Sequence, residues 1–196
     1  MKRRPENRFS ALDFYESGEG VSHVETNAVR RIQRALTLRA LQLVMFPIDQ
    51  KILDAGCGSG YSLDVLNEVG YSAQGFDLSP KLVGLAKAKG LEVKVGDLTD
   101  VPFPTASIGG IISISALQWI LKGNDTDKKK NVKRAAQEFK RVLRPRGKAV
   151  VQFYAESVFD EELVRKVFEK QGFKAELVVD NPQNKRKRKV FLVCSA

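Results

Sequence analysis

The glycine-rich segment Leu53–Gly60, Leu-Asp-Ala-Gly-Cys-Gly-Ser-Gly, constrains the fold of this chain more than any other stretch. Lys51 and Ile52 before it begin a short buried strand, and Tyr61–Val69 after it has the pattern of a helix. The three glycines permit a tight turn and let a ligand approach the backbone more closely than a Cβ would allow. Strand, glycine turn and helix in this order are typical of a phosphate or nucleotide cradle in a doubly wound sheet.

The glycine turn alone leaves three interpretations open: a dinucleotide site, an S-adenosylmethionine (SAM) site, or a purely structural turn. A second strand is expected over Ser72–Phe76, followed by Asp77, and the pair Ser79-Pro80 predicts a helix that runs to about Lys89. Asp77 therefore lies at the tip of a strand about 20 residues beyond the glycines, where a carboxylate can accept both ribose hydroxyls. The two features together favour an adenosine ligand over a plain surface loop.

The rest of the chain predicts strands and helices in alternation. Further strands are expected at Leu91–Val95, Ile108–Ile114, Lys148–Tyr154, Phe173–Val179 and Val190–Cys194, and helices at Val132–Val142 and Glu161–Gln171. Val21–Phe46 has helical spacing that ends before Pro47, whereas residues 1–20 suggest an irregular arm. The expected fold is one α/β domain over residues 1–196: a seven-stranded, mostly parallel sheet with helices on both faces, a terminal antiparallel hairpin, and residues 1–46 capping the pocket.

The net charge of +10 and the pI near 9.7 favour polyanionic partners such as nucleic acid, with a generally basic proteome as the alternative. Two basic runs are candidates for phosphate contacts, or else solvated surface: Lys128, Lys129 and Lys130, and Lys185, Arg186, Lys187, Arg188 and Lys189. The two cysteines make a zinc site or a disulfide framework implausible, so no metal site is predicted. No apolar run approaches the roughly 20 residues that span a bilayer, and no signal peptide is visible, so we expect a cytoplasmic protein with no membrane partner.

The order of elements resembles that of the Rossmann-like class I SAM-dependent methyltransferases over nearly the whole chain. The motifs behind this resemblance are Asp54–Gly60, Phe76–Pro80, Gly96–Leu98 and Leu143–Lys148. The resemblance implies SAM as the cofactor, bound by Asp54, Gly56, Gly58, Asp77, Leu78, Asp97, Leu98 and Ser113. In that arrangement Gly56 and Gly58 contact the methionine part, Asp77 the ribose, and Asp97 with Leu98 the adenine. Tyr15 or Trp119 could stabilise the sulfonium by about 0.5–2 kcal/mol, or belong to the core.

The expected fourth strand bears on the methyl acceptor. It does not end in a cysteine, which disfavours a cysteine–pyrimidine adduct, and it lacks the Asn/Asp-Pro-Pro-aromatic tetrapeptide of enzymes that methylate exocyclic amines. Guanine N7 carries a lone pair and can attack a methyl group without losing a proton, so positioning supplies most of the catalysis.

The octapeptide Ile112–Trp119, together with Arg4-Pro5-Glu6 and Phe14-Tyr15 in the arm, resembles the eukaryotic and archaeal small-subunit rRNA guanine-N7 methyltransferases. This resemblance implies that Ser113, Ser115, Gln118 and Trp119 border the methyl donor and the base. Ser113, Gln118 and Trp119 would act by positioning, without a general base. Trp119 or Tyr154 would stack on the base, a contact worth about 1–3 kcal/mol.

The same resemblance implies partners: small-subunit rRNA or its precursor particle, and a small zinc-binding activator protein that pairs with the edge strand Leu91–Val95 to form a heterodimer. An unpaired apolar edge favours association on physical grounds as well. Eukaryotic members continue into a long basic tail, whereas this chain stops at Ala196, so an archaeal-type member is expected. Two alternatives stay open: a metabolite or quinone methyltransferase on the same core, and a SAM-binding ribosome-assembly factor whose main role is not catalytic.

Overall fold

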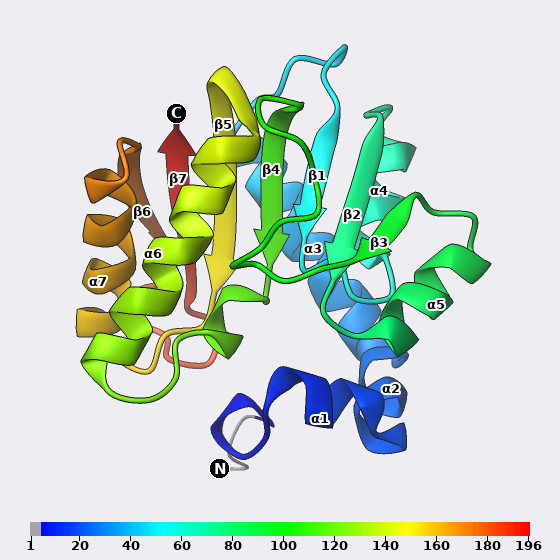
Figure 1. The fold of residues 1–196 in the computed structure, drawn as a ribbon. Helices are drawn as coiled ribbons and strands as arrows, with labels where there is room; N and C mark the ends of the chain where they lie inside the picture. The colour runs from blue at the N-terminus through cyan, green and yellow to red at the C-terminus, as the bar shows by residue number, and fades with distance from the viewer. Residues whose placement is uncertain (1–4) are drawn as a thin grey trace.

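A seven-stranded sheet forms the centre of the computed structural model, which describes residues 5–196 (Figure 1). The strand order is β3-β2-β1-β4-β5-β7-β6; the first five strands run parallel, and β7 pairs antiparallel with both β5 and β6. The strands are β1 Ile52–Ala55, β2 Ala73–Asp77, β3 Val93–Val95, β4 Ile108–Ile114, β5 Leu143–Phe153, β6 Lys174–Asp180 and β7 Lys189–Ser195. The expected fold class, with a third strand at one edge and a terminal antiparallel hairpin, is confirmed.

Helices cover both faces of this sheet, with α6 and α7 in front and α3 and α4 behind it in the view of Figure 1. The helices are α1 Ala11–Glu16, α2 Gly18–Val24, α3 Asn27–Leu43, α4 Tyr61–Glu68, α5 Pro80–Ala88, α6 Asp125–Val142 and α7 Val158–Lys170, with short 3-10 helices η1 Pro5–Asn7 and η2 Leu117–Trp119. No helix within residues 5–196 is both long enough and apolar enough to cross a bilayer.

Two apolar clusters fill the space between sheet and helices, because successive side chains of a strand point to opposite faces. Leu53 packs with Phe139 of α6 and Phe168 of α7, whereas its neighbour Ile52 packs with Leu36 of α3 and the helices α4 and α5. Both faces of β1 are thus buried, which explains why its neighbouring residues Ile52 and Leu53 are both apolar instead of alternating with polar ones. This burial fixes the C-terminal ends of the strands, where the candidate site lies.

The N-terminal arm is helical over much of its described length, which corrects the expectation of an irregular segment. α1 follows Ser10, whose Oγ accepts a hydrogen bond from the N–H of Asp13 at 3.1 Å; α2 follows Ser17, whose Oγ accepts from the N–H of Gly20 at 3.1 Å. The two helices have six and seven residues, too few for apolar periodicity to reveal α1 or the start of α2; only Val21–Val24 fall in the helical stretch predicted from Val21. Arg4, part of the arm motif, lies outside the described residues.

The helix α6 begins at Asp125, seven residues before the expected start at Val132. Asn124 caps it, since its Oδ1 accepts from the N–H of Asp127 at 3.0 Å, and the aspartates of the first turn favour the positive end of the helix dipole. The first buried side chain of α6 is that of Val132. Apolar spacing therefore starts only there, which explains the difference.

Three strands also differ in length from the prediction. β7, Lys189–Ser195, is one residue longer at each end than the expected Val190–Cys194. β5 begins at Leu143 instead of Lys148, because Leu143 already pairs with Ile108 before the register shifts. The edge strand β3 covers Val93–Val95 and is shorter than the expected Leu91–Val95. Its position at the sheet edge is as expected.

Candidate active site

The glycine turn joins the C-terminal end of β1 to α4. The N–H groups of Gly56 and Cys57 both donate to the carbonyl of Phe76 at 2.9 Å, so the turn is held against the end of β2. Gly56, Gly58 and Gly60 have φ values of +82°, +54° and +91°, a backbone region that side chains disfavour. The sequence motif therefore forms the tight turn that its glycines predict.

Asp77 ends β2, and its carboxylate lies against the glycine turn. Its Oδ2 accepts a hydrogen bond from the N–H of Gly58 at 2.8 Å, and its Oδ1 accepts from the N–H of Ser79 at 3.0 Å. Burial raises the pKa of Asp77, while the hydrogen bonds from Ser79 and Gly58 act in the opposite direction. Each carboxylate oxygen has a further lone pair that can accept from a ligand hydroxyl.

Asp54 lies in β1 next to the turn and is only 1% exposed. Neither of its carboxylate oxygens has a hydrogen-bond partner in the described structure, and burial, followed by the charge of Asp77, raises its pKa well above the usual range. An unpartnered buried carboxylate is costly, so the position favours a cationic ligand group nearby, such as the amino group of a methionine moiety. Asp54 itself is not among the residues that line the cavity described next.

A cavity of about 600 Å³ lies at the C-terminal ends of the parallel strands, covered by α1 and α2 at the bottom of Figure 1. The cover is joined to α5 through Glu16, whose Oε1 accepts from the hydroxyl of Ser79 at 2.6 Å and from the N–H of Lys81 at 3.2 Å. The predicted site residues that line the cavity are Gly56, Gly58, Asp77, Leu78, Asp97, Leu98, Gln118 and Trp119. One cavity thus brings together motifs from four separate parts of the chain.

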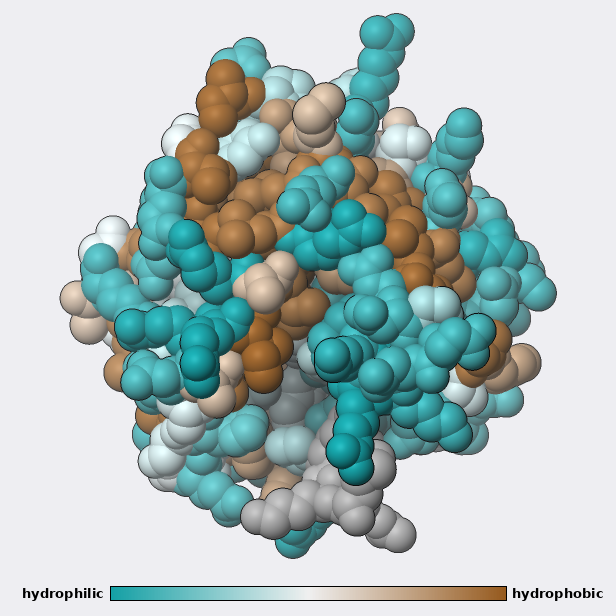
Figure 2. Space-filling model, turned by 180° about the vertical axis from the view of Figure 1, so that it is seen from behind, coloured by the Kyte–Doolittle hydropathy of each residue, from teal (hydrophilic) through white to brown (hydrophobic). Residues whose placement is uncertain are grey.

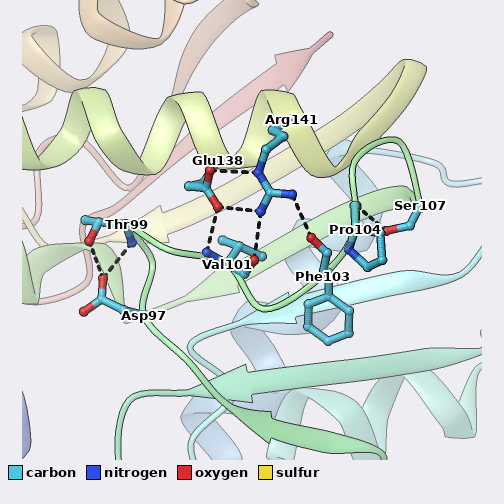
Figure 3. A network of polar contacts seen from close by, with 8 residues as sticks. All are labelled: Asp97, Thr99, Val101, Phe103, Pro104, Ser107, Glu138 and Arg141. Atoms are coloured by element: carbon cyan, nitrogen blue, oxygen red, sulfur yellow. Dashed lines mark hydrogen bonds and ion pairs between the residues drawn. The ribbon is translucent and has the colours of Figure 1, made fainter.

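Asp97 and Leu98 follow β3 in a loop that turns on itself. The Oδ1 of Asp97 accepts from the N–H and the hydroxyl of Thr99 at 2.6 and 2.7 Å, which leaves Oδ2 available to a ligand (Figure 3). Leu98 supplies an apolar wall beside it. A carboxylate next to an apolar surface suits the edge and face of an adenine.

This loop is held from above by two side chains of α6, as Figure 3 shows. Arg141 donates to the carbonyls of Val101 and Phe103, both at 2.8 Å, and Glu138 accepts from the N–H of Val101 at 2.8 Å. Arg141 and Glu138 also form an ion pair, with Nη2 and Oε2 2.6 Å apart. The backbone beyond Asp97 therefore takes its position from α6 and not from a helix of its own.

Aromatic rings form another wall of the cavity. Trp119 stacks on Phe14 of α1 at a centroid distance of 5.9 Å and meets Tyr15 edge to face at 5.2 Å. Burial and the charge of Asp77 raise the pKa of Tyr15, while its hydrogen bond with Trp119 lowers it. Tyr154, at the end of β5, lines the same cavity. These rings offer flat apolar faces for a planar ligand or a cation.

Two of the residues predicted to act by positioning have different environments. Gln118 lines the cavity; its amide nitrogen donates to the carbonyl of Ser115 at 2.7 Å, and its buried Oε1 has no partner in the described structure. Ser113 is fully buried in β4, and its hydroxyl donates to the carbonyl of Ala55 at 2.7 Å. The structure thus places Ser113 outside the cavity lining, because its side chain points into the sheet layer and not toward the strand end.

The two basic runs meet at the N-terminal end of α7. Lys128 forms an ion pair with Asp160, with Nζ and Oδ1 2.9 Å apart, and Arg188 makes two contacts with Glu161, at 2.5 and 2.8 Å. Among the remaining basic residues, Lys189 lies over the ring of Tyr154 at 5.0 Å, and the others are exposed: Lys129, Lys130, Lys185, Arg186 and Lys187. Runs that are far apart in the sequence thus form one surface, with Lys128 and Arg188 engaged in holding it together.

Sequence reasoning missed several contacts that shape the site. Glu16 bonds to Ser79, which is 63 residues away, and Lys122 donates to the carbonyl of Phe9 from 113 residues away. Neither pairing has a local sequence signal. The spacing of Glu138 and Arg141 on a predicted helix could have indicated an i,i+3 pair, but not its contacts with the loop. The described residues contain no group of three or more His, Cys, Asp or Glu side chains able to hold a metal ion.

The fold, the glycine turn, Asp77 and the shared cavity define a Rossmann-like SAM-dependent methyltransferase, and a family model described as "Methyltransferase domain" matches residues 53–151. The 18S rRNA (guanine-N(7))-methyltransferase bud23 of Schizosaccharomyces pombe is 33% identical over 201 residues, covering 98% of this chain and 74% of the relative. The Mus musculus 18S rRNA (guanine-N(7))-methyltransferase is 37% identical over 200 residues, covering 98% and 70%. This chain belongs to the family of 18S rRNA (guanine-N(7))-methyltransferases.

Solved structures are similar in fold. The methyltransferase in a complex with the Haloferax volcanii Trm112 methyltransferase activator superimposes with a TM-score of 0.71 at 21% identity, covering 95% of this chain and 97% of that chain. The agreement extends over the N-terminal helices as well as the sheet, since nearly the whole of both chains is covered.

Proposed function

We propose that this chain transfers a methyl group from SAM to N7 of a guanine in small-subunit rRNA, as part of ribosome biogenesis. Its support is the near full-length similarity to relatives that carry that activity in their names, 33% and 37% identical. The structural observation that carries the proposal is the shared cavity. There the glycine turn and Asp77, which suit the cofactor, face the same space as Trp119 and Tyr154, which suit a base.

The residues of the cavity fit SAM. Gly56 and Gly58 present backbone to the methionine part, Asp77 has lone pairs for the ribose hydroxyls, and Asp97 with Leu98 suits the adenine. When bound, SAM supplies an electrophilic methyl group: the N7–carbon bond forms as the carbon–sulfur bond breaks, and sulfur keeps the electron pair.

The chain's own residues act by positioning. Trp119 and Tyr154 hold the base by stacking, worth about 1–3 kcal/mol. The helices α1 and α2 cover the cavity and keep water away from the reacting atoms. Since N7 needs no deprotonation, alignment at about 3–3.5 Å can supply on the order of 7–11 kcal/mol. The role of Ser113 in this scheme is to hold the end of β4 through its bond to Ala55.

The exposed basic residues around α7 would contact rRNA phosphates: Lys129, Lys130, Lys185, Arg186 and Lys187. They share a surface with Lys189, which lies over Tyr154 at the cavity. Lys128 and Arg188 would act in part through Asp160 and Glu161, by fixing where this surface lies. Such contacts give affinity that does not depend on sequence and falls with salt.

A small zinc-binding activator is the proposed protein partner, seated on β3. β3 pairs only with β2 in the described sheet, and Val95 on it is 50% exposed. A free edge can accept a strand from a partner. The structural neighbour from Haloferax volcanii was solved with the activator Trm112, which supports a heterodimer here. A cytoplasmic location stays a prediction from the sequence.

The test is methyl transfer from radiolabelled SAM to purified small ribosomal subunits, with the activator present, followed by nucleoside analysis of the rRNA. The expected product is 7-methylguanosine.

An Asp77→Ala variant should bind SAM at least about 100-fold more weakly, because two hydrogen bonds to a charged group, about 1.5–3 kcal/mol each, are lost. The control Asp49→Ala, at an exposed turn far from the cavity lining, should bind SAM like the wild type. SAM binding by the wild-type complex without rRNA methylation would contradict the proposed acceptor.

A further inference from the structure

Three carboxylates line the cavity: Glu6, Asp77 and Asp97. Asp77 is engaged by the N–H groups of Gly58 and Ser79, and Asp97 by Thr99. Glu6 has no hydrogen bond or ion pair with any other residue in the part of the chain that the structure describes. Among the described residues, Glu6 is therefore the lining carboxylate with no partner on either oxygen, and neither the cofactor nor the stacking scheme uses it.

The arm holds Glu6 on the aromatic side of the cavity. Within η1 and just after it, the N–H groups of Arg8 and Phe9 donate to the carbonyl of Pro5 at 2.9 and 3.1 Å. Lys122 donates to the carbonyl of Phe9 and lies 4.8 Å from the ring centroid of Trp119. These bonds connect the arm to the stacking surface that follows β4.

The charge of Glu6 acts on the same region, since it interacts electrostatically with both Tyr15 and Lys122. Tyr15 and Lys122 each contact the ring of Trp119. The carboxylate thus lies near the surface on which the base would stack, and not at the glycine turn.

We infer that Glu6 recognises the target guanine by accepting hydrogen bonds from its N1–H and its N2 amino group. The inference rests on the proposed function and names the residue that makes it selective for guanine. A carboxylate is an acceptor with two oxygens side by side, which matches the two adjacent donors on this edge of guanine. Adenine presents an unprotonated N1 there, which repels a carboxylate. N7 lies on the opposite edge of the purine and stays available for methylation.

Gln118 lines the cavity and also has an unpartnered acceptor, its side-chain Oε1, but it fits this task less well. Its amide nitrogen donates to the carbonyl of Ser115, so only its side-chain oxygen is left to accept a hydrogen bond. One oxygen can satisfy only one of the two donors of guanine, and the unpaired donor would be costly.

The experiment measures binding of mononucleotides to the full chain in complex with its activator, saturated with S-adenosylhomocysteine. Trp119 is the only tryptophan of the chain, so with a tryptophan-free activator its fluorescence reports on stacking. The probes are GMP and IMP, which differ only in the N2 amino group. The wild type should bind GMP about tenfold more tightly than IMP, because IMP lacks the amino group that donates one hydrogen bond to the charged carboxylate. Glu6→Ala should bind both equally, and the control Glu19→Ala, an exposed glutamate on α2, should keep the preference.

Four results would overturn the inference. The wild type fails to bind GMP, or Glu6→Ala keeps the preference for GMP over IMP, or Glu6→Ala binds both nucleotides more weakly by the same factor. The fourth result is that Gln118→Met loses the preference while Glu6→Ala keeps it. Weaker binding of S-adenosylhomocysteine by Glu6→Ala would also overturn it, because Glu6 would then serve the cofactor. The methylation assay separates this inference from the proposed function. If wild-type complex forms 7-methylguanosine in rRNA while the GMP preference is independent of Glu6, only the inference fails. If it forms none, the proposed function fails.

Discussion

At Gly56, two constraints exclude any other residue. Its φ of +82° lies where a side chain is strained, and an added Cβ would meet the Cβ of Ala116 at 2.4 Å. Ala116 follows β4, so the glycine lets the turn after β1 approach the segment that carries Gln118 and Trp119. The close approach of these two strand ends is what puts cofactor groups and base-stacking groups into one cavity.

We predict that Gly56→Ala lowers the free energy of unfolding by about 2–4 kcal/mol, because backbone strain and overpacking each cost about 1–3 kcal/mol. Urea unfolding followed by circular dichroism measures it. Gly84→Ala is the matched control: Gly84 lies within α5, its added Cβ meets nothing within 4 Å, and alanine there should raise stability by about 0.5–1 kcal/mol. Equal stability of the two variants would contradict the steric argument.

At the scale of elements, α6 shapes the adenine side of the cavity from a distance. Glu138 and Arg141 form hydrogen bonds with three backbone groups of the loop between β3 and β4. Over Gly96–Ser107 this loop contains no helix or strand, only one isolated bridge. Arg141 also holds the pKa of Glu138 below its usual range, chiefly through their side-chain hydrogen bond. The position of Asp97 and Leu98 thus depends on a charged pair in a different element.

We predict that Glu138→Gln lowers the thermal unfolding midpoint at pH 7 and weakens SAM binding. Because the folded-state pKa of Glu138 is lowered, its stabilisation is present above the unfolded value of about 4.5 and is lost as the pH falls below it. The difference between wild type and variant should therefore shrink between pH 5 and about pH 3. Thermal scans and SAM titrations at pH 5 and at about pH 3 measure this difference.

Glu162→Gln is the matched control for that prediction. Glu162 forms an i,i+3 pair with Arg165 on the surface of α7, but bonds to no loop backbone. Because solvent screens an exposed pair, the unfolding midpoint and the SAM affinity of this variant should change little. A control that loses as much SAM affinity as Glu138→Gln would contradict a specific role of the loop contacts.

At the scale of the molecule, two features favour association with partners. The net charge of +10 suits a polyanion. Apolar side chains are also exposed: on the face that carries α3 and α4, Figure 2 shows them gathered across the upper half, and Met45 and Ile48 before β1 are among the exposed apolar residues of the chain. With the free edge at β3, this surface predicts poor solubility of the isolated chain.

The edge of β3 allows a sharp test of the activator contact. Glu92 and Gly96 bond to β2, so alternation directs the N–H of Val95 to the free side. We predict that Val95→Pro removes a donor needed by the partner strand and abolishes the complex in gel filtration, while the unfolding midpoint of the chain changes little. The control is Val95→Thr, which keeps the N–H and should keep the complex. Retention of the complex by Val95→Pro would place the activator elsewhere.

The sequence by itself determined the elements with local signals. The glycine turn, Asp77 at a strand tip, and apolar runs for the strands were predictable because turn geometry, strand burial and helix caps depend on nearby residues. α1 and the first turn of α2 were missed because helices of six or seven residues are too short for periodicity, although Ser10 and Ser17 carried the cap signal.

Only the tertiary structure decided which side chains face the cavity. Ser113 and Gln118 lie in one octapeptide, yet the strand buries Ser113 while η2 turns Gln118 into the cavity. Glu16 and Arg141 act through partners distant in the sequence, and Glu6 has no hydrogen-bond or ion-pair partner within residues 5–196. Their roles depend on long-range packing, for which spacing along the chain holds no physical information.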